Sequence, residues 1–297
     1  MDYAKVIINI RQQLKDYIVK NNLKSLVIGI SGGIDSCIVA ALAKPVCDEL
    51  NIHLIGLSLP TMTNTIEEID RATRTCKAFC SKYKEIYLDD MFLHLGVSIN
   101  LQPFNRGYAK DEDTNEENEK RQMNWKIRNG NIKARLRMIY LYNLASMNEG
   151  LVLSTDNYSE YMLGFWTIHG DVGDYAPIQE LWKSEVYDLA EWLVNNEFKD
   201  DKERKNLLIY TISSMATDGL GVHAGGDLGQ ILPDWIGNSR GSSRSGYNEI
   251  DRILQLYLTN KMILDDIVDN PIIERHEKSK FKRLLPISIS RKSLLYV

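Results

Sequence analysis

The sequence of 297 residues has no long apolar run, no excess of basic residues and few cysteines. No apolar segment approaches the roughly 20 residues that a membrane-spanning helix needs, and the charged N-terminal stretch lacks the apolar middle of a signal peptide. The formal net charge of −4 provides no basic surface in bulk for nucleic acid. We therefore expect a cytoplasmic protein that has neither nucleic acid nor a membrane as its partner.

The cysteines and the catalytic motifs are sparse as well. Cys37, Cys47, Cys76 and Cys80 include no Cys-x-x-Cys pair, and no spaced histidine pair completes a zinc site. Buried free thiols are common in protein cores, so we expect structural roles for all four. The chain also lacks a recognisable Ser-His-Asp arrangement.

Short apolar runs alternate with helical patterns along the chain. The runs predict strands at 25–30, 52–59, 85–90 and 150–156. Apolar residues at three- and four-residue spacing predict helices at 2–21, 35–49, 63–83, 124–148, 182–196, 205–214, 247–259 and 261–279. This alternation predicts an α/β fold, an open doubly wound parallel sheet flanked by helices, as a single domain over residues 1–297.

Two segments interrupt the alternation. Residues 105–122 are almost wholly polar, and residues 216–246 contain eight glycines with little periodicity. Long segments of this kind in a compact domain are usually functional loops or disordered. We expect both to be mobile loops that exclude water from a nearby site.

Three polar segments follow predicted strands: ISGGIDS at 30–36, SLPT at 58–61 and STDNYSE at 154–160. Ligands of open parallel sheets bind at the carboxyl ends of the strands. The three segments therefore predict one ligand site at this edge of the sheet.

The first of these segments is suited to phosphate. Gly32 and Gly33 permit a sharp turn whose N–H groups form an anion-binding nest, and Ser31 and Ser36 add hydroxyl donors. A Walker loop would add Gly-Lys-Ser/Thr, and that lysine is missing. Asp35 would repel a triphosphate unless a cation stood between them, which predicts Mg²⁺. The alternative is that Asp35 only stabilises the positive end of the following helix.

The SGGIDS turn resembles the SGGxDS loop of ATP pyrophosphatases, which activate a carbonyl oxygen as its adenylate. Further segments resemble ammonia-dependent NAD synthetases in the same order along the chain, from about residue 25 to residue 286. These segments are GNIKARLRM (130–138), LVLSTD with NYSEYMLGF (151–165), HGDVGDYAPIQELWKSEV (169–186), YNEIDRIL (247–254) and FKRLLP (281–286).

The resemblance implies residue roles. It assigns Mg²⁺ to Asp35 and Glu160 and catalytic roles to Asp35 and Lys183. The implied ATP-binding residues are Gly29, Ile30, Ser31, Gly32, Gly33, Ile34, Asp35, Ser36, Thr155, Lys183 and Thr217. The implied deamido-NAD-binding residues are Arg135, Asp174 and Lys282. Without the resemblance, Thr155 would be explained as a turn cap, and Glu160, Lys183 and Lys282 as solvated side chains.

The implied reaction joins ATP, deamido-NAD and ammonia through a nicotinate adenylate and releases AMP, pyrophosphate and NAD. Family members are homodimers, and residues 124–148 would lie near the interface. Glutamine-using relatives carry an additional amidase domain, for which 297 residues would leave no room, so we expect free ammonia, or ammonia from a separate partner, as the nitrogen source. Ile168 and Phe281 replace a lysine and a histidine of the family. Another adenylating enzyme, such as one that modifies tRNA, and a nucleotide-binding regulator without activity are the alternatives.

Overall fold

Four parallel strands form the centre of the molecule. A computed structural model describes residues 1–99, 115–223, 225–232 and 242–285. The strands lie in the order β3-β2-β1-β4, and Val27 of β1 pairs with Ile55 of β2 and with Val152 of β4. Their bounds are Ser25–Gly29 for β1, His53–Ser58 for β2, Lys82–Glu85 for β3 and Gly150–Leu153 for β4. The predicted parallel sheet is confirmed.

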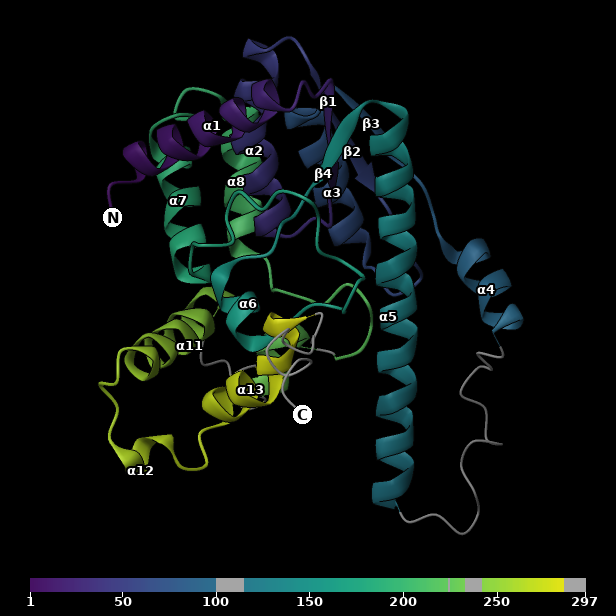
Figure 1. The fold of residues 1–297 in the computed structure, drawn as a ribbon, viewed down its shortest axis with the longest axis vertical. Helices are drawn as coiled ribbons and strands as arrows, with labels where there is room; N and C mark the ends of the chain where they lie inside the picture. Colours follow the sequence, from purple (N-terminus) through teal and green to yellow (C-terminus); the bar gives the residue numbers. More distant parts are fainter. Residues whose placement is uncertain (100–114, 224, 233–241, 286–297) are drawn as a thin grey trace, which may run out of the picture.

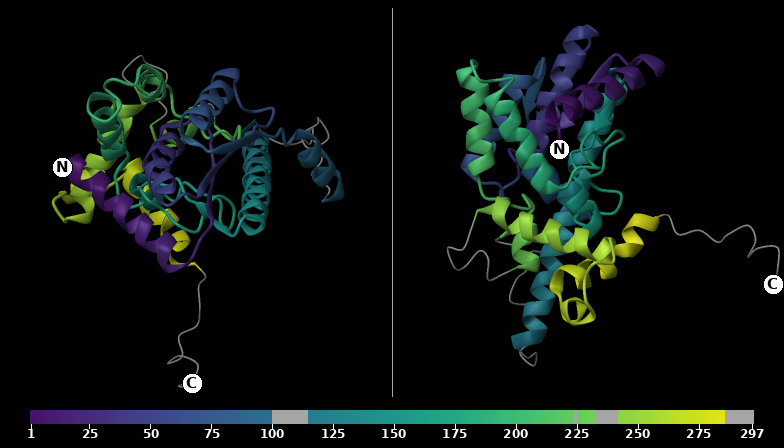
Figure 2. Two further views of the ribbon diagram at one scale, coloured as in Figure 1. Left: turned by 90° about the horizontal axis from the view of Figure 1, so that it is seen from above. Right: turned by 90° about the vertical axis from the view of Figure 1, so that its left-hand side faces the viewer.

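Helices cover both faces of this sheet (Figure 1, Figure 2). Leu26 and Ile28 of β1 belong to the larger core, whereas Val27 belongs to a second core on the opposite face. The larger core is covered by α1 (Tyr3–Lys20), α2 (Ile34–Glu49), α3 (Ile66–Phe79), α7 (Lys183–Asn195) and α8 (Lys202–Ser213). The second is covered by α5 (Asn115–Met147) and α4 (Asp89–Ser98). The alternation of side chains along a strand thus gives the doubly wound arrangement.

A further group of helices lies beyond the carboxyl ends of the strands, beside the lower half of α5 in Figure 1, and packs onto the larger core. Its members are α6 (Tyr158–Leu163), α9 (Gly226–Ile231), α11 (Ser243–Leu258), α12 (Leu264–Ile267), α13 (Pro271–Ser279) and the 3₁₀ helix η1 (Lys280–Leu284). This group and the strand ends enclose the space in which the predicted site falls.

The structure differs from the sequence-based expectations in several segments, and the helices α4 and α6 were not predicted. Residues 115–122 are the first two turns of α5, although we expected a loop over 105–122, and residues 105–114 lie outside the described residues. The third strand is Lys82–Glu85 instead of 85–90. The expected loop at 216–246 contains α9 and the start of α11. The helix expected at 261–279 is divided into α12 and α13.

Two expectations concern the whole molecule. Within the described residues, no helix has the length and apolar character needed to cross a membrane. All four cysteines are free, and Cys37, Cys47 and Cys76 are buried. The thiols therefore act as small core residues, as expected.

The turn after β1 depends on one glycine. Gly32 has a φ of +83°, and a Cβ at this position would lie 2.2 Å from the backbone oxygen of Glu68. The Arg71 Nε also donates to the Gly32 oxygen at 2.8 Å. This turn is therefore closed against α3 in a geometry that other residues cannot adopt without displacement.

We expect Gly32→Ala to lower the free energy of unfolding by roughly 1–3 kcal/mol, because it adds a side chain at positive φ against backbone. Gly33→Ala is the matched control, since Gly33 has an extended backbone and its Cβ would meet only the Ser31 hydroxyl, at 3.3 Å. Urea unfolding of both variants measures the difference. Equal losses would contradict the role of the Gly32 conformation.

Candidate active site

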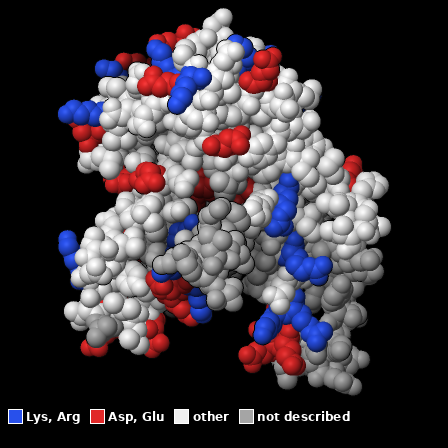
Figure 3. Space-filling model, in the orientation of Figure 1, with Lys and Arg blue, Asp and Glu red and all other residues white. Residues whose placement is uncertain are grey.

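A cavity of about 720 Å³ opens at the carboxyl ends of β1, β2 and β4. Its walls come from the turn after β1, the segment after β4, the starts of α3 and α7, the middle of α5, residues 214–220, 222, 227 and 230, and the C-terminal helices. Figure 3 shows acidic side chains deep in this hollow and basic side chains along its α5 side. The volume lies within the range of small-molecule sites, roughly 300–1,000 Å³.

The turn between β1 and α2 forms one wall of the cavity. The Ser31 Oγ accepts from the Gly33 N–H at 3.2 Å, and the Ser36 hydroxyl donates to the Gly33 oxygen at 3.2 Å. Gly33 is the N-cap of α2 and has no side chain to cap the helix. The first N–H groups of α2 are therefore available to an anion, at the positive end of a 16-residue helix.

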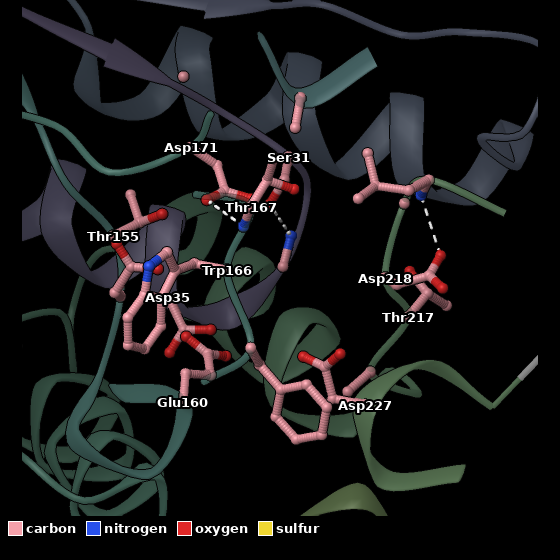
Figure 4. A pocket seen from close by; sticks show the side chains of 18 of the residues that line it. Ser31, Asp35, Thr155, Glu160, Trp166, Thr167, Asp171, Thr217, Asp218 and Asp227 are labelled. Atoms are coloured by element: carbon pink, nitrogen blue, oxygen red, sulfur yellow. Dashed lines mark hydrogen bonds between the residues drawn. The ribbon is translucent and has the colours of Figure 1, made fainter. Parts of the chain in front are cut away.

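Three charged side chains meet beside this turn. Asp35 comes from the first turn of α2, Glu160 from α6 and Lys183 from the start of α7. The Lys183 ammonium pairs with an Asp35 oxygen and lies 3.2 Å from the Glu160 Oε1. Lys183 is only 3% exposed. Figure 4 shows the Asp35 and Glu160 carboxylates side by side.

The protonation of this cluster depends on its burial. Burial alone would lower the pKa of Lys183, but Asp35 and Glu160 raise it well above its usual value, so the ammonium stays charged. Burial raises the pKa of Glu160 to about 8, with Lys183 opposing the shift and Asp35 adding to it, so Glu160 is largely protonated at neutral pH. Within the described residues no three metal-ligating side chains cluster. A divalent cation would fit here with Asp35 and Glu160 as ligands only if it displaced the Lys183 ammonium and the Glu160 proton, with phosphate oxygens of a bound nucleotide completing its coordination.

A buried network holds Lys183 at its position. The Lys183 backbone N–H donates to the Ser159 Oγ at 2.8 Å, and the Ser184 N–H donates to the Asp251 Oδ2 at 2.8 Å. The Ser159 hydroxyl in turn donates to Asp251, which is 1% exposed. Asp251 thus satisfies the start of α7 and stabilises its positive end, which offsets the unfavourable placement of a lysine there.

The glycine-rich segment closes the cavity on the side of α3 and α5. The Thr217 hydroxyl donates to Glu68, and the Arg137 guanidinium donates to the Gly219 oxygen at 3.1 Å. The Asp218 carboxylate accepts from the backbone N–H groups of residues 220–223. The described part of this segment is therefore held by side chains of the sheet body, with Thr217 facing the cavity.

The structure brings most of the predicted site residues together. The cavity is lined by Gly29, Ile30, Ser31, Gly33, Ile34, Asp35, Arg135, Thr155, Glu160, Lys183, Thr217 and Lys282. Gly32 and Ser36 shape the turn without lining the cavity. Asp174 lies outside it and is exposed: its carboxylate accepts from the Val152 N–H at 3.0 Å and from the Tyr142 hydroxyl at 3.1 Å.

Five acidic residues of the cavity were not selected from the sequence, Glu68, Asp156, Asp171, Asp218 and Asp227, and three of them have raised pKa values. Burial raises the pKa of Asp156 to about 7 and that of Asp171 to about 6, and it raises the pKa of Asp227 well above the usual range. Asp171 accepts from the Thr167 N–H at 2.9 Å. The HGDVGDY segment, which is one residue shorter than the corresponding segment of the family, contains both Asp171 and Asp174. The expectation that Asp174 binds the substrate assumed that the missing residue falls before Asp174.

A second part of the cavity wall is aromatic and basic. The rings of Tyr161 and Trp166 stack at 5.6 Å, and the Lys282 ammonium lies 5.4 Å from the Trp166 ring centroid. Arg135 donates to the Ile168 oxygen at 2.9 Å. Burial lowers the pKa of Lys282 to about 8. Ile168 and Phe281 also line this part.

Comparison with known proteins gives a consistent result. The sequence profile of the NAD synthase family matches residues 6–197. The NH(3)-dependent NAD(+) synthetase of Thermococcus sibiricus is 33% identical over 209 residues, 70% of this chain and 72% of that protein. The Helicobacter pylori (strain J99) enzyme is 33% identical over 196 residues, 65% of each chain. The NMN synthetase structure from Francisella tularensis shares the fold, with a TM-score of 0.71, 23% identity and coverage of 98% and 99%.

The buried acid Asp156 predicts a pH dependence of stability. Its pKa rises from an ordinary 3.8 to about 7 in the folded protein, so the stability present at low pH is lost as the pH rises through 7. Because the cavity is open to solvent, we expect Asp156→Asn to raise the free energy of unfolding at pH 8 by only about 1–2 kcal/mol. At pH 4.5 the variant should match the wild type. Urea unfolding at both pH values measures this, and an equal effect at the two would contradict it.

Proposed function

Because the chain belongs to the NAD synthase family, we infer that it is an NAD(+) synthase, which uses ATP to amidate deamido-NAD with ammonia. The observation that carries this inference is the meeting of Asp35, Glu160 and Lys183 beside an anion-binding turn. We place the reaction in the cytoplasm, where ATP is supplied and where the four free thiols would stay reduced.

We propose that ATP binds with its triphosphate over the turn after β1. The first N–H groups of α2 and the Ser31 hydroxyl would donate to phosphate oxygens. Mg²⁺ held by Asp35 and Glu160 would neutralise the negative charge that develops on pyrophosphate. With the two carboxylates so neutralised, the Lys183 ammonium would be free to pair with phosphate. Thr155 and Thr217, on opposite walls, would contact the nucleotide.

The acceptor would occupy the aromatic and basic part of the cavity. The Trp166 ring offers a flat surface to a nicotinate ring, and Arg135 and Lys282 supply cations for its carboxylate or for phosphate. This part shares Trp166, Ile168 and Lys282 with a neighbouring cavity of about 410 Å³, which leaves room for a larger substrate. Ile168 and Phe281 stand where the family has charged or polar groups, so Arg135 would carry more of the binding here.

The chain's own residues would act by positioning and by moving one proton. In the first step, an oxygen of the nicotinate carboxylate attacks the α-phosphorus of ATP and pyrophosphate leaves. In the second, ammonia attacks the activated carbonyl carbon, AMP leaves and one proton is released. Asp171 could take that proton, because its pKa of about 6 leaves it ionised at neutral pH inside the cavity.

Incubation with Mg·ATP, deamido-NAD and ammonium should give AMP, pyrophosphate and NAD in equal amounts. We expect Asp35→Asn and Glu160→Gln to reduce kcat by at least about 100-fold, because each removes a carboxylate ligand of the proposed Mg²⁺, whose charge would stabilise the leaving pyrophosphate. Glu197→Gln is the control: Glu197 pairs with Arg11 away from the cavity and should be neutral. Nicotinate mononucleotide is tested in parallel as the acceptor.

Each outcome of this assay has a meaning. ATP binding without turnover of either acceptor would favour the regulator without activity. Turnover of the mononucleotide alone would retain the chemistry and change the acceptor. ATP cleavage that depends on tRNA would favour the tRNA-modifying alternative. Near-normal rates of Asp35→Asn or Glu160→Gln would contradict the metal assignment.

We also propose that the chain forms a homodimer through the outer faces of α4 and α5. These helices leave large apolar side chains exposed, with Val97 at 81%, Ile139 at 61% and Met147 at 71%, and α5 extends well beyond the body of the molecule (Figure 1). Large apolar side chains exposed on two neighbouring helices support an interface at this side of the molecule.

Light scattering after size-exclusion chromatography should give twice the mass of 34.0 kDa. Ile139→Glu should shift the protein toward the monomer, because it places a charge in the proposed interface. Val19→Glu is the matched control, since Val19 is also 61% exposed but lies on α1. A wild-type monomer, or the same effect from both variants, would overturn this assignment.

A further inference from the structure

Asn157 lies between the two carboxylates of the proposed metal site. It follows β4, has an exposed fraction of 0% and is the N-cap of α6. Its side-chain oxygen accepts from the Glu160 N–H at 3.0 Å, and its own backbone N–H donates to the Glu160 Oε2 at 3.3 Å. Its side-chain nitrogen donates to the Asp35 Oδ1 at 3.1 Å. One buried amide thus contacts both acidic residues.

The orientation of this amide is set by its partners. The Glu160 N–H can only donate, so it must face the amide oxygen, and the ionised Asp35 carboxylate can only accept, so it must face the amide nitrogen. If the amide were rotated by 180°, its NH₂ group would face the Glu160 N–H, and its oxygen would face the Asp35 carboxylate. Neither pair could form a hydrogen bond. The N-cap and the Asp35 contact therefore specify the same rotamer.

We propose that Asn157 is a positioning residue for the metal ligands: it fixes the Asp35 and Glu160 carboxylates at one separation. This inference rests on the proposed function, because it concerns the same site. Without Asn157, the two acids would be joined only through Lys183, whose charge is needed at the phosphates. The side-chain amide of Asn157 holds the Asp35 carboxylate and the Glu160 backbone, and its backbone N–H holds the Glu160 carboxylate. Because these groups are uncharged, they position both acids without neutralising them.

The consequence is that Asn157 has two separable tasks. As an N-cap, it can be replaced by Ser or Asp, which cap helices about as well. As a donor to Asp35 it cannot: Asn157→Ser has a side chain too short to span the same contacts, and Asn157→Asp places a second acceptor against Asp35. These two variants therefore keep the helix start and lose the positioning contact.

The test measures Mn²⁺ binding by electron paramagnetic resonance, with a non-hydrolysable ATP analogue present, and urea unfolding of the same proteins. We expect Asn157→Ser and Asn157→Asp to weaken Mn²⁺ binding by about 10- to 100-fold. Asn157→Ser should keep an unfolding midpoint close to that of the wild type, whereas Asn157→Asp should lower it, because it buries a second carboxylate against Asp35. The Mg²⁺ concentration for half-maximal activity should rise correspondingly. Asp201→Ala is the control: it removes the N-cap of α8, outside the cavity, and should lower the unfolding midpoint while leaving Mn²⁺ affinity unchanged.

Two results would overturn the proposal. Unchanged Mn²⁺ affinity in both Asn157 variants would show that the residue is only a helix cap, and a loss of affinity that follows the unfolding midpoint, Asp201→Ala included, would show a general effect of stability. Wild-type protein that binds no Mn²⁺ would overturn the metal site and the role of Asn157 together. Wild-type protein that binds Mn²⁺ in the Asn157-dependent way but makes no NAD would overturn the proposed function alone.

Discussion

The pairing of the Lys183 ammonium with Asp35 and Glu160 is the interaction on which the site depends. It joins α2, α6 and α7 in one place, and these helices follow β1 and β4, which are neighbours in the sheet. Such a cluster is stable only when its charged groups are paired, because an isolated buried charge is costly. The parallel order of the sheet supplies the meeting point, and Ser159, Asn157 and Asp251 fix the helix ends around it.

The same cluster explains how a stable fold can contain a reactive site. Burial raises the pKa values of Glu160, Asp156 and Asp171. Ionisation of these acids therefore costs the folded protein stability. That cost is offset by the two apolar cores on either side of the sheet. A substrate complex that brings positive charge into the cavity would relieve it, which couples ligand binding to the stability of the protein.

The sequence was most informative where local chemistry and topology agree. The polar segments after β1 and β4 predicted a common site because parallel strands end at one edge, and the structure places Asp35, Thr155 and Glu160 around one cavity. The start of α5 was missed because Asn115–Gln122 has good helix formers but no apolar periodicity, as suits a helix that projects into solvent. The edge strand β3 was misplaced because its residues, KYKE, are all exposed. The Asn157 contact with Asp35 and the Asp251 contact with Ser159 join residues distant in sequence, which no local pattern indicates.

The central claim is that a metal ion binds between the Asp35 and Glu160 carboxylates in the nucleotide complex, at the place where the Lys183 ammonium lies in this structure. The most direct measurement is a crystal structure of the complex with Mn²⁺ and a non-hydrolysable ATP analogue, with anomalous scattering recorded to locate the metal. Our account predicts a manganese peak bound by both Asp35 and Glu160, with the Lys183 ammonium moved to a phosphate oxygen. Manganese bound by neither acid, or Lys183 still paired with both acids beside the bound nucleotide, would contradict it.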